Sequence, residues 1–153
     1  MTTSGSICLR CKTPLPDGAN YCHHCGVSVS AAATGEYPVF DYERLFNYAI
    51  DLLCIAGTDG YFKVVNPAFE RALGYTASEL LKRPFAELIH PDDRDATHAE
   101  VERLADGTPT LAFKNRYRKK DGTYVVLDWM AFPERATKLI YATARVLGPP
   151  EEF

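Results

Sequence analysis

Four of the chain's five cysteines fall within eighteen residues and form two Cys-x-x-Cys pairs, Cys8 with Cys11 and Cys22 with Cys25. A Cys-x-x-Cys turn places two sulfurs on one side of a tight loop, and two such turns supply the four corners of a tetrahedron around a metal ion. A segment this short cannot bury a useful core, so metal ligation must supply its folding energy. The pattern therefore predicts a structural zinc site with these four thiolates as ligands.

The same thiols allow other chemistry, which the pattern favours less. A catalytic or redox centre is disfavoured because a closed four-cysteine site leaves no coordination position open. Disulfides and an iron centre remain as alternatives. His23 and His24 lie inside the second turn and could replace a cysteine as ligand, although exposed turn residues are the simpler interpretation. The segment resembles the short four-cysteine zinc ribbons at the N-terminus of many bacterial proteins, with a turn predicted from Pro14 to Gly18.

The charge and the motif content exclude several classes of function. A net charge of −3 argues against a nucleic-acid-binding protein held by bulk charge. The one basic cluster, Lys114 to Lys120, is interpreted as a solvated strand edge and turn. The sequence has no glycine-rich phosphate loop, nucleophile elbow or metal-protease helix, and Asp92 and Asp93 suit a helix cap better than acid–base catalysis. We therefore expect no enzymatic activity.

Neither a membrane nor a secretory route is predicted. No apolar run approaches the ~18 residues that span a bilayer. The first residues also lack the basic-then-apolar pattern of a signal peptide. We expect a cytoplasmic protein, in which thiols stay reduced and bind metal rather than pair with one another.

Composition divides the chain into four segments. The four-cysteine zinc ribbon is expected to occupy residues 1–28, and the small, uncharged residues that follow predict a flexible linker over 29–37. Residues 38–148 are expected to form the larger folded domain, and residues 149–153 a short tail. The boundary thus lies where the cysteine pattern ends and helical periodicity begins.

The larger domain begins with helical spacing and then turns to strands. Apolar residues from Phe40 to Leu53 predict an amphipathic helix with Asp41 as N-cap. Thr58-Asp-Gly60 is a hairpin signal between two apolar runs, 52–56 and 61–65. Asn66 is expected to cap the next helix, with Pro67 in its first position.

The middle of the chain predicts short helices. Thr76 or Ser78 caps the segment 77–82, and Pro84 begins another over 85–89. A longer helix is expected to start at Asp92 or Asp93 and to reach about residue 105. Its inward residues are Val101 and Leu104.

The last third alternates as β-strands. In the strand from 111 to 118, one face is predicted to carry Leu111, Phe113, Asn115 and Tyr117. Two further strands, 124–132 and 139–147, are apolar on both faces, and a sheet of that kind must be covered on both sides. The middle helices can cover one face, and the 40–53 helix or a partner must cover the other.

The element order predicts an α+β fold: a five-stranded antiparallel sheet with helices over one face. This order resembles the PAS family from about Tyr42 to Gly148. The motifs that carry the resemblance are Thr58-Asp-Gly-Tyr61, Val65-Asn-Pro-Ala-Phe-Glu-Arg-Ala-Leu-Gly-Tyr75, Ser78-Glu-Leu-Leu81, Leu88-Ile-His-Pro-Asp-Asp-Arg94 and Tyr117-Arg-Lys-Lys-Asp-Gly-Thr-Tyr124.

The resemblance implies a sensor module rather than an enzyme. PAS domains bind small ligands between sheet and helices, and they dimerise through an N-terminal helix and the sheet, here the 40–53 helix and one sheet face. The residues expected to line a pocket, each equally well explained as plain core, are Phe69, Leu73, Leu88, Ile89, Phe113, Tyr117, Leu127 and Trp129.

Two cofactors can be weighed from the same resemblance. A photosensing flavin subclass needs an Asn-Cys-Arg motif on the helices, and residues 66–105 contain no cysteine, which excludes it. Haem-binding members use a histidine on the long helix, where this chain has His98, although a polar helix suggests that His98 faces water. Cys54 is expected to be a buried, inert thiol. Zinc is thus the one cofactor predicted, and the PAS ligand stays unidentified.

Together these features predict a small intracellular signal-transduction protein that senses a ligand and contacts a protein partner. With no effector domain before Phe153, we expect it to act in trans on an unidentified effector, as a homodimer. One alternative is a transcription-related regulator whose zinc ribbon contacts nucleic acid or polymerase. Another is a redox or gas sensor that carries haem or a different cofactor.

Overall fold

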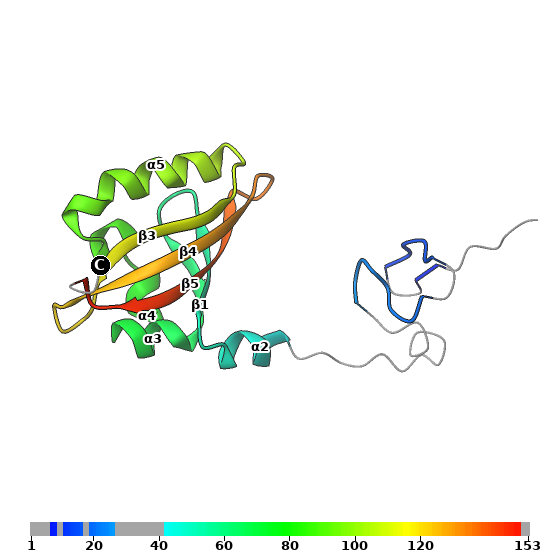
Figure 1. Cartoon of the computed structure of the whole chain (residues 1–153), viewed down its shortest axis with the longest axis horizontal. Helices are drawn as coiled ribbons and strands as arrows, with labels where there is room; N and C mark the ends of the chain where they lie inside the picture. Colours follow the sequence, from blue (N-terminus) through cyan, green and yellow to red (C-terminus); the bar gives the residue numbers. More distant parts are fainter. Residues whose placement is uncertain (1–6, 9–10, 17–18, 27–41, 151–153) are drawn as a thin grey trace, which may run out of the picture. The chain divides into compact units, whose positions relative to one another are not determined.

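The computed structural model describes residues 7–8, 11–16, 19–26 and 42–150 (Figure 1). The chain divides into two compact units, Met1–Asp41 and Tyr42–Phe153. Several predicted features lie outside the described residues: the Asp17-Gly18 turn, the 29–37 linker, the Asp41 cap and the end of the tail.

The larger unit is built on one antiparallel sheet with the strand order β2-β1-β5-β4-β3. This confirms the predicted five-stranded antiparallel sheet. Its first and last strands lie side by side within the sheet, because β1 pairs with β5. The strands are β1 Leu52–Gly57, β2 Phe62–Val65, β3 Thr110–Arg118, β4 Tyr124–Glu134 and β5 Leu139–Gly148.

The helices come before and between these strands, and Figure 1 shows α5 running along the sheet beside β3 and β4. In the described residues, no helix combines the length and the apolarity needed to cross a membrane. The helical elements are α2 Tyr42–Tyr48, α3 Pro67–Leu73, α4 Ala77–Leu81, the 3-10 turns η1 Phe85–Leu88 and η2 Pro91–Asp93, and α5 Arg94–Ala105.

The core lies between the helices and the inner face of the sheet. Leu127 and Trp129 of β4 are buried there against Phe69 and Leu73 of α3. The ring of Phe62 meets that of Phe69 edge-on, with centroids 5.3 Å apart. Val101 and Leu104 of α5 also pack against this core, as predicted.

The predicted helix over 40–53 is too long. Helix α2 ends at Tyr48, and Leu52 and Leu53 belong to β1, where they pair with Ala144 and Thr143 of β5. Strand pairing with β5 therefore overrides the helical periodicity of this stretch. Helix α2 itself buries no residue.

The predicted inner face of β3 is wrong at its first residue. Leu111 is 68% exposed, whereas Thr110 is 3% exposed. A bulge explains the exchange: Thr110 pairs with Ala131 and Phe113 with Trp129, so β3 has one residue more than β4 between these pairs. Beyond the bulge, Asn115 and Tyr117 are buried as predicted.

Candidate functional site

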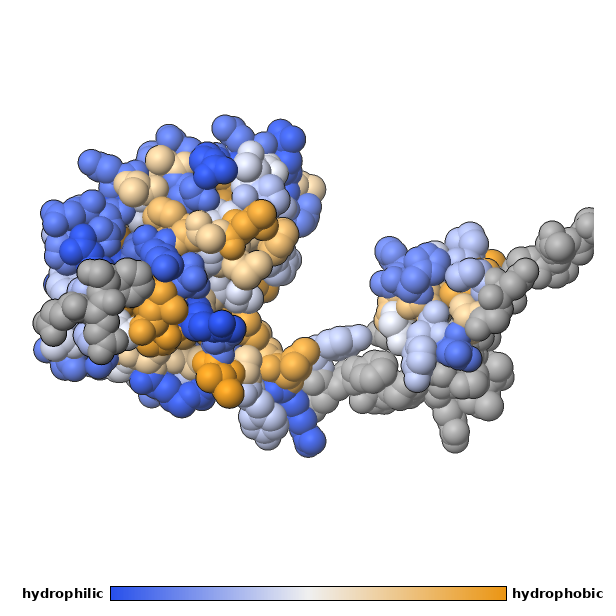
Figure 2. Space-filling model, in the orientation of Figure 1, coloured by the Kyte–Doolittle hydropathy of each residue, from blue (hydrophilic) through white to orange (hydrophobic). Residues whose placement is uncertain are grey.

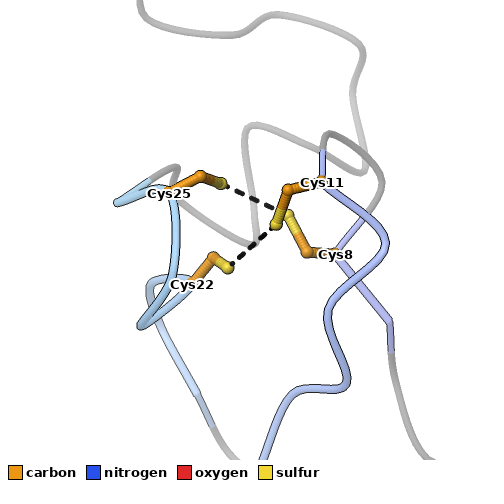
Figure 3. Close-up of side chains that lie close together, drawn as sticks. All are labelled: Cys8, Cys11, Cys22 and Cys25. Carbon is orange, nitrogen blue, oxygen red and sulfur yellow. Dashed lines mark hydrogen bonds between the residues drawn. The ribbon is translucent and has the colours of Figure 1, made fainter. Parts of the chain in front are cut away.

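The four cysteine sulfurs of the smaller unit converge from two loops (Figure 3). All four lie within 4.8 Å of one another. The Sγ atoms of Cys8 and Cys25 are 3.6 Å apart, as are those of Cys11 and Cys22. Sulfurs around a tetrahedral zinc with Zn–S bonds of ~2.3 Å are separated by ~3.8 Å, whereas a disulfide bond is ~2.05 Å long. The donor set and its spacing therefore fit a metal ion, and no disulfide joins these cysteines.

The two loops share one backbone design. In the first, Lys12 N donates to Cys8 O at 2.8 Å, and in the second Gly26 N donates to Cys22 O at the same distance. Each loop then ends on a left-handed residue, Lys12 with φ 62° and Gly26 with φ 70°. Glycine adopts this conformation without strain, which explains Gly26. Each turn thus presents its two sulfurs on the same side.

Little besides sulfur holds this unit together. Its buried residues among those described are Cys8, Leu15 and Cys22. Hydrogen bonds with the side chain and backbone of Thr13 lower the pKa of Cys11 to about 6, which favours the thiolate that a metal requires. His23 and His24 are exposed and are not part of the sulfur cluster.

The larger unit contains a cavity of about 70 Å³ between α5 and the inner face of the sheet. Of the eight predicted pocket residues, three line it: Phe113, Tyr117 and Trp129. The other five are buried in the core but do not line the cavity; they come from α3, from η1 and the residue after it, and from β4, and they are Phe69, Leu73, Leu88, Ile89 and Leu127.

Small side chains on the inner face create this space. Cys54 and Ala56 of β1, Ala131 of β4 and Ala142 of β5 all line the cavity. Each leaves room that a larger residue would fill, so small inward residues on neighbouring strands were the signal in the sequence that could have predicted the cavity.

Figure 2 shows apolar surface, in orange, among the hydrophilic surface of this unit.

A chain of buried hydrogen bonds stiffens one wall of the cavity. Trp129 Nε1 donates to Asn115 Oδ1 at 2.9 Å, and Asn115 Nδ2 donates to Thr97 Oγ1 at 3.1 Å. The Thr97 hydroxyl in turn donates to the backbone oxygen of Asp93 at 2.7 Å. The chain of hydrogen bonds thus links β4, β3 and α5 on one side of the cavity.

Asp93 occupies the N-cap position of α5, as predicted, but its side chain holds the start of the helix to β3 and makes no cap bond. Its Oδ2 accepts from Arg116 N and Nε, both at 2.8 Å, and Oδ1 accepts from Arg116 Nη2. The carboxylate makes no cap bond to the helix, because the guanidinium fork supplies stronger donors. These bonds hold the pKa of Asp93 below its usual range.

Asp93→Asn should lower the free energy of unfolding of the larger unit by about 2 kcal/mol, because the bonds to a charged acceptor weaken. Because Arg116 lowers the pKa of Asp93, its contribution is present at neutral pH and is lost as the carboxylate protonates below its ordinary pKa of ~3.9. Urea unfolding followed through Trp129 measures the change. Asp95→Asn is the matched control, since Asp95 is exposed in the first turn of α5, whereas Asp92 lies 3.9 Å from Arg116. Equal loss in both variants would contradict the prediction.

Cys54 and His98, the other two residues considered for cofactor chemistry, lie in different surroundings. Burial raises the pKa of Cys54 to about 12, so this cavity residue is a neutral thiol. His98 lies on α5 with its side chain 76% exposed, near Glu102, and does not line the cavity. An axial haem ligand is therefore not positioned there.

The basic cluster of β3 and the following turn is largely neutralised by acidic neighbours. Arg116 pairs with Asp93, Lys119 with Asp121, and Lys120 with Glu79 of α4 at 2.8 Å. The charges that nucleic acid would need thus serve contacts within the unit.

Two known proteins resemble about half of this chain. The White collar 2 protein of Neurospora crassa is 36% identical over 75 residues, which is 48% of this chain and 14% of that protein. Blue light receptor lreB of Aspergillus flavus is 27% identical over 81 residues, 53% of this chain and 16% of that protein. The chain thus spans less than a fifth of either relative's length.

A solved structure and a family model also match this chain. A domain of the sensory box sensor histidine kinase/response regulator from Geobacter sulfurreducens is 29% identical with a TM-score of 0.61, covering 68% of this chain and 90% of that one. The family model described as PAS fold matches residues 62–139, half of the sequence. The match covers β2, β3, β4 and the helices between β2 and β3, and the chain belongs to the PAS fold family.

Proposed function

We propose that this protein is a non-enzymatic sensory module that binds a small molecule inside its PAS domain and signals through protein–protein contacts. The observation that carries the proposal is the two-sided character of the sheet. Its inner face lines a cavity, whereas apolar side chains stand exposed on its outer face. A ligand on one side is thereby separated from a partner on the other by a single layer of backbone.

The outer face offers a continuous apolar surface. Phe132 of β4 pairs directly with Tyr141 of β5, and Met130 lies two residues along β4. Their exposed fractions are 51%, 46% and 47%. Val64 of β2 extends the surface and is 41% exposed. Exposed apolar residues gathered in this way are typical of a protein-binding surface.

An unsatisfied acceptor on the same face also supports a partner. Asp128 lies between the inward Leu127 and Trp129, so its side chain points outward. Its Oδ1 atom is buried and has no hydrogen-bond partner among the described residues. A buried acceptor of this kind costs free energy until a donor reaches it, and a docked partner can bring a donor only where docking shifts the neighbouring side chains.

The partner in this proposal is a second copy of the chain. Helix α2 carries Tyr42, Leu45 and Tyr48 at helical spacing, 60%, 71% and 78% exposed. The helix therefore presents an uncovered stripe, and the sheet presents an uncovered face of the same apolar character. Docking the stripe of each copy on the outer face of the other would bury both and form a symmetric dimer.

Phe132→Glu should weaken this dimer at least about tenfold, because a charge replaces an aromatic anchor in an apolar contact. Sedimentation equilibrium of the full-length chain measures the dissociation constant. Tyr21→Glu is the control, since Tyr21 is an aromatic that is 66% exposed in the smaller unit. A wild-type chain that stays monomeric at millimolar concentration would contradict the proposal.

The proposed metal of the smaller unit is zinc in a structural role. Four thiolates suit zinc and leave no position for a substrate, and their reduced state fits a cytoplasmic compartment. Native mass spectrometry should find one zinc ion per chain. The basic side chains that nucleic acid would need are mostly paired within the larger unit, so the proposed partner is a protein.

One relative is named a blue light receptor, but we do not propose light reception for this protein. Residues 66–105 contain no cysteine that could react with a flavin. The cavity of about 70 Å³ is also smaller than the ~150 Å³ cavity that accommodates benzene in an engineered protein.

A further inference from the structure

The polar atoms around the cavity are paired with one exception. Thr97, Asn115 and Trp129 bond to one another. Glu100 Oε1 accepts from Thr110 Oγ1 at 2.5 Å, and its Oε2 accepts from Arg103 Nη1 at 2.9 Å. The hydroxyl of Tyr117 has no hydrogen-bond partner among the residues that the structure describes.

Tyr117 is a buried residue of the cavity lining. It belongs to the inner face of β3, is 3% exposed and lines the cavity. Its ring lies against Trp129, with centroids 5.6 Å apart. Burial raises the pKa of Tyr117, so the group stays a neutral O–H donor at physiological pH. An apolar cavity with one free donor favours a ligand that brings one acceptor.

The size of the cavity limits the ligand. A cavity of about 150 Å³ admits the six carbon atoms of benzene, whereas this one measures about 70 Å³. By proportion it holds roughly three non-hydrogen atoms, so about four is an upper limit. Flavins and haem are several times larger than benzene and would need the helices to separate from the sheet.

The charge of the lining limits the ligand further. Glu100 is the one carboxylate in the lining, and its side chain is 14% exposed. Its negative charge repels an anion. Because its two oxygens already accept hydrogen bonds from Thr110 and Arg103, a cationic ligand would gain little by binding to it. Transfer of any charged ligand into the apolar remainder also costs more than transfer of a neutral one.

We propose that the cavity binds a small neutral molecule of at most about four non-hydrogen atoms, whose carbonyl or hydroxyl oxygen accepts a hydrogen bond from Tyr117. The inference rests on the proposed sensory function and names the class of ligand at that site. Short-chain ketones, aldehydes, alcohols and amides fall in this class, whereas carboxylates of the same size do not.

Acetone and acetate are matched probes, because they have the same number of non-hydrogen atoms and differ in charge. The full-length, zinc-loaded chain contains one tryptophan, Trp129, so its indole N–H signal in a ¹⁵N spectrum reports on the cavity alone. Acetone should shift this signal saturably, with an affinity no better than about 10⁻⁵ M for four atoms. Acetate should leave it unchanged, and equal binding of acetate would overturn the neutral class.

Tyr117→Phe should weaken acetone binding about two- to twelvefold, the range expected for one hydrogen bond. Tyr75→Phe is the matched control, because Tyr75 is also buried, at 7% exposed, but does not line the cavity. Undiminished binding in Tyr117→Phe would overturn the role of its hydroxyl.

A cavity-filling variant separates this inference from the proposed function. Ala142→Leu places three more carbon atoms in the lining and should abolish the acetone shift. The dimer dissociation constant is measured on the same samples. If acetone fails to shift Trp129 in the wild-type chain while the dimer persists, the ligand class is wrong; if the wild-type chain is monomeric while acetone binds, the signalling proposal fails instead.

Discussion

Cys22→Ser is expected to abolish metal retention and to unfold the smaller unit while the larger unit stays folded. Cys22 is 1% exposed and supplies one of four sulfurs that lie within 4.8 Å of one another. A serine hydroxyl is a poor zinc ligand at neutral pH, because only the deprotonated form of such a side chain binds the metal well. The remaining three thiolates cannot close a four-coordinate structural site.

The effect should be large because no other interaction substitutes for the metal. Among the described residues, the core of this unit contains Leu15 as its one buried residue besides cysteine. Structural zinc contributes about 10–16 kcal/mol in small zinc-binding peptides, which exceeds the stability of most whole domains. Native mass spectrometry should show the loss of one zinc mass, and ¹⁵N spectra should show collapsed signals for residues 7–26 with unchanged signals for 42–148.

Cys54→Ala is the control, because it removes a buried thiol from the larger unit and leaves the four ligands intact. It should retain zinc. A Cys22→Ser chain that keeps both the metal and the dispersed signals of residues 7–26 would contradict the four-thiolate site.

The same site should lose its metal as the pH falls. Thiolates bind zinc and thiols do not, and the pKa of Cys11 is lowered from 9.0 to about 6. Without a metal this thiol is therefore largely deprotonated above about pH 6, and a bound zinc ion would keep it deprotonated to a lower pH. Zinc release in a pH titration should therefore begin near or below that value in the folded unit.

Local chemistry in the sequence predicts the parts of the fold that depend on neighbouring residues. The Thr76 hydroxyl accepts a hydrogen bond from the backbone N–H of Glu79, and the Glu79 carboxylate accepts one from the backbone N–H of Thr76. This pair of bonds is typical of serine or threonine followed by glutamate three residues later. Gly74 ends α3 with φ 81°, where a Cβ would be strained. The Cys-x-x-Cys turns belong to the same class, so the sulfur cluster was predictable as well.

Features that depend on distant residues were not predictable. The exposure of Leu111 follows from a bulge against β4, and the end of α2 follows from pairing of β1 with β5. Asp93 was expected to cap a helix, but Arg116, 23 residues later, engages its carboxylate instead. The cavity is the same kind of feature, because it arises where small residues of three strands meet beneath α5.

Asn66 is the polar residue whose replacement should affect the larger unit most. It occupies the N-cap position of α3, as predicted, but its side chain makes no cap bond. Instead Oδ1 accepts from Leu53 N at 3.0 Å, and Nδ2 donates to the backbone oxygens of Phe46 and Asp51, both at 3.1 Å. One buried amide, 1% exposed, thus joins α2, β1 and α3.

Asn66→Ala should lower the free energy of unfolding by about 3 kcal/mol, since three hydrogen bonds of about 1 kcal/mol each are lost and their partners stay buried. Asn47→Ala removes the same atoms from a half-buried residue of α2 whose side chain forms no hydrogen bond with the described residues, and it should change stability by less than about 0.5 kcal/mol. Urea unfolding followed through Trp129 measures both.

The location of the loss matters as much as its size. Because α2 buries no residue of its own, the Asn66 bonds and the bond from Arg71 Nη2 to Ala49 O are what hold its end to α3. Asn66→Ala should therefore speed amide exchange much more in residues 46–53 than in β4. It should also weaken the proposed dimer, because that dimer needs α2 in place. Uniform acceleration across the whole sheet would show that Asn66 supports the core in general and has no special role in positioning the helix.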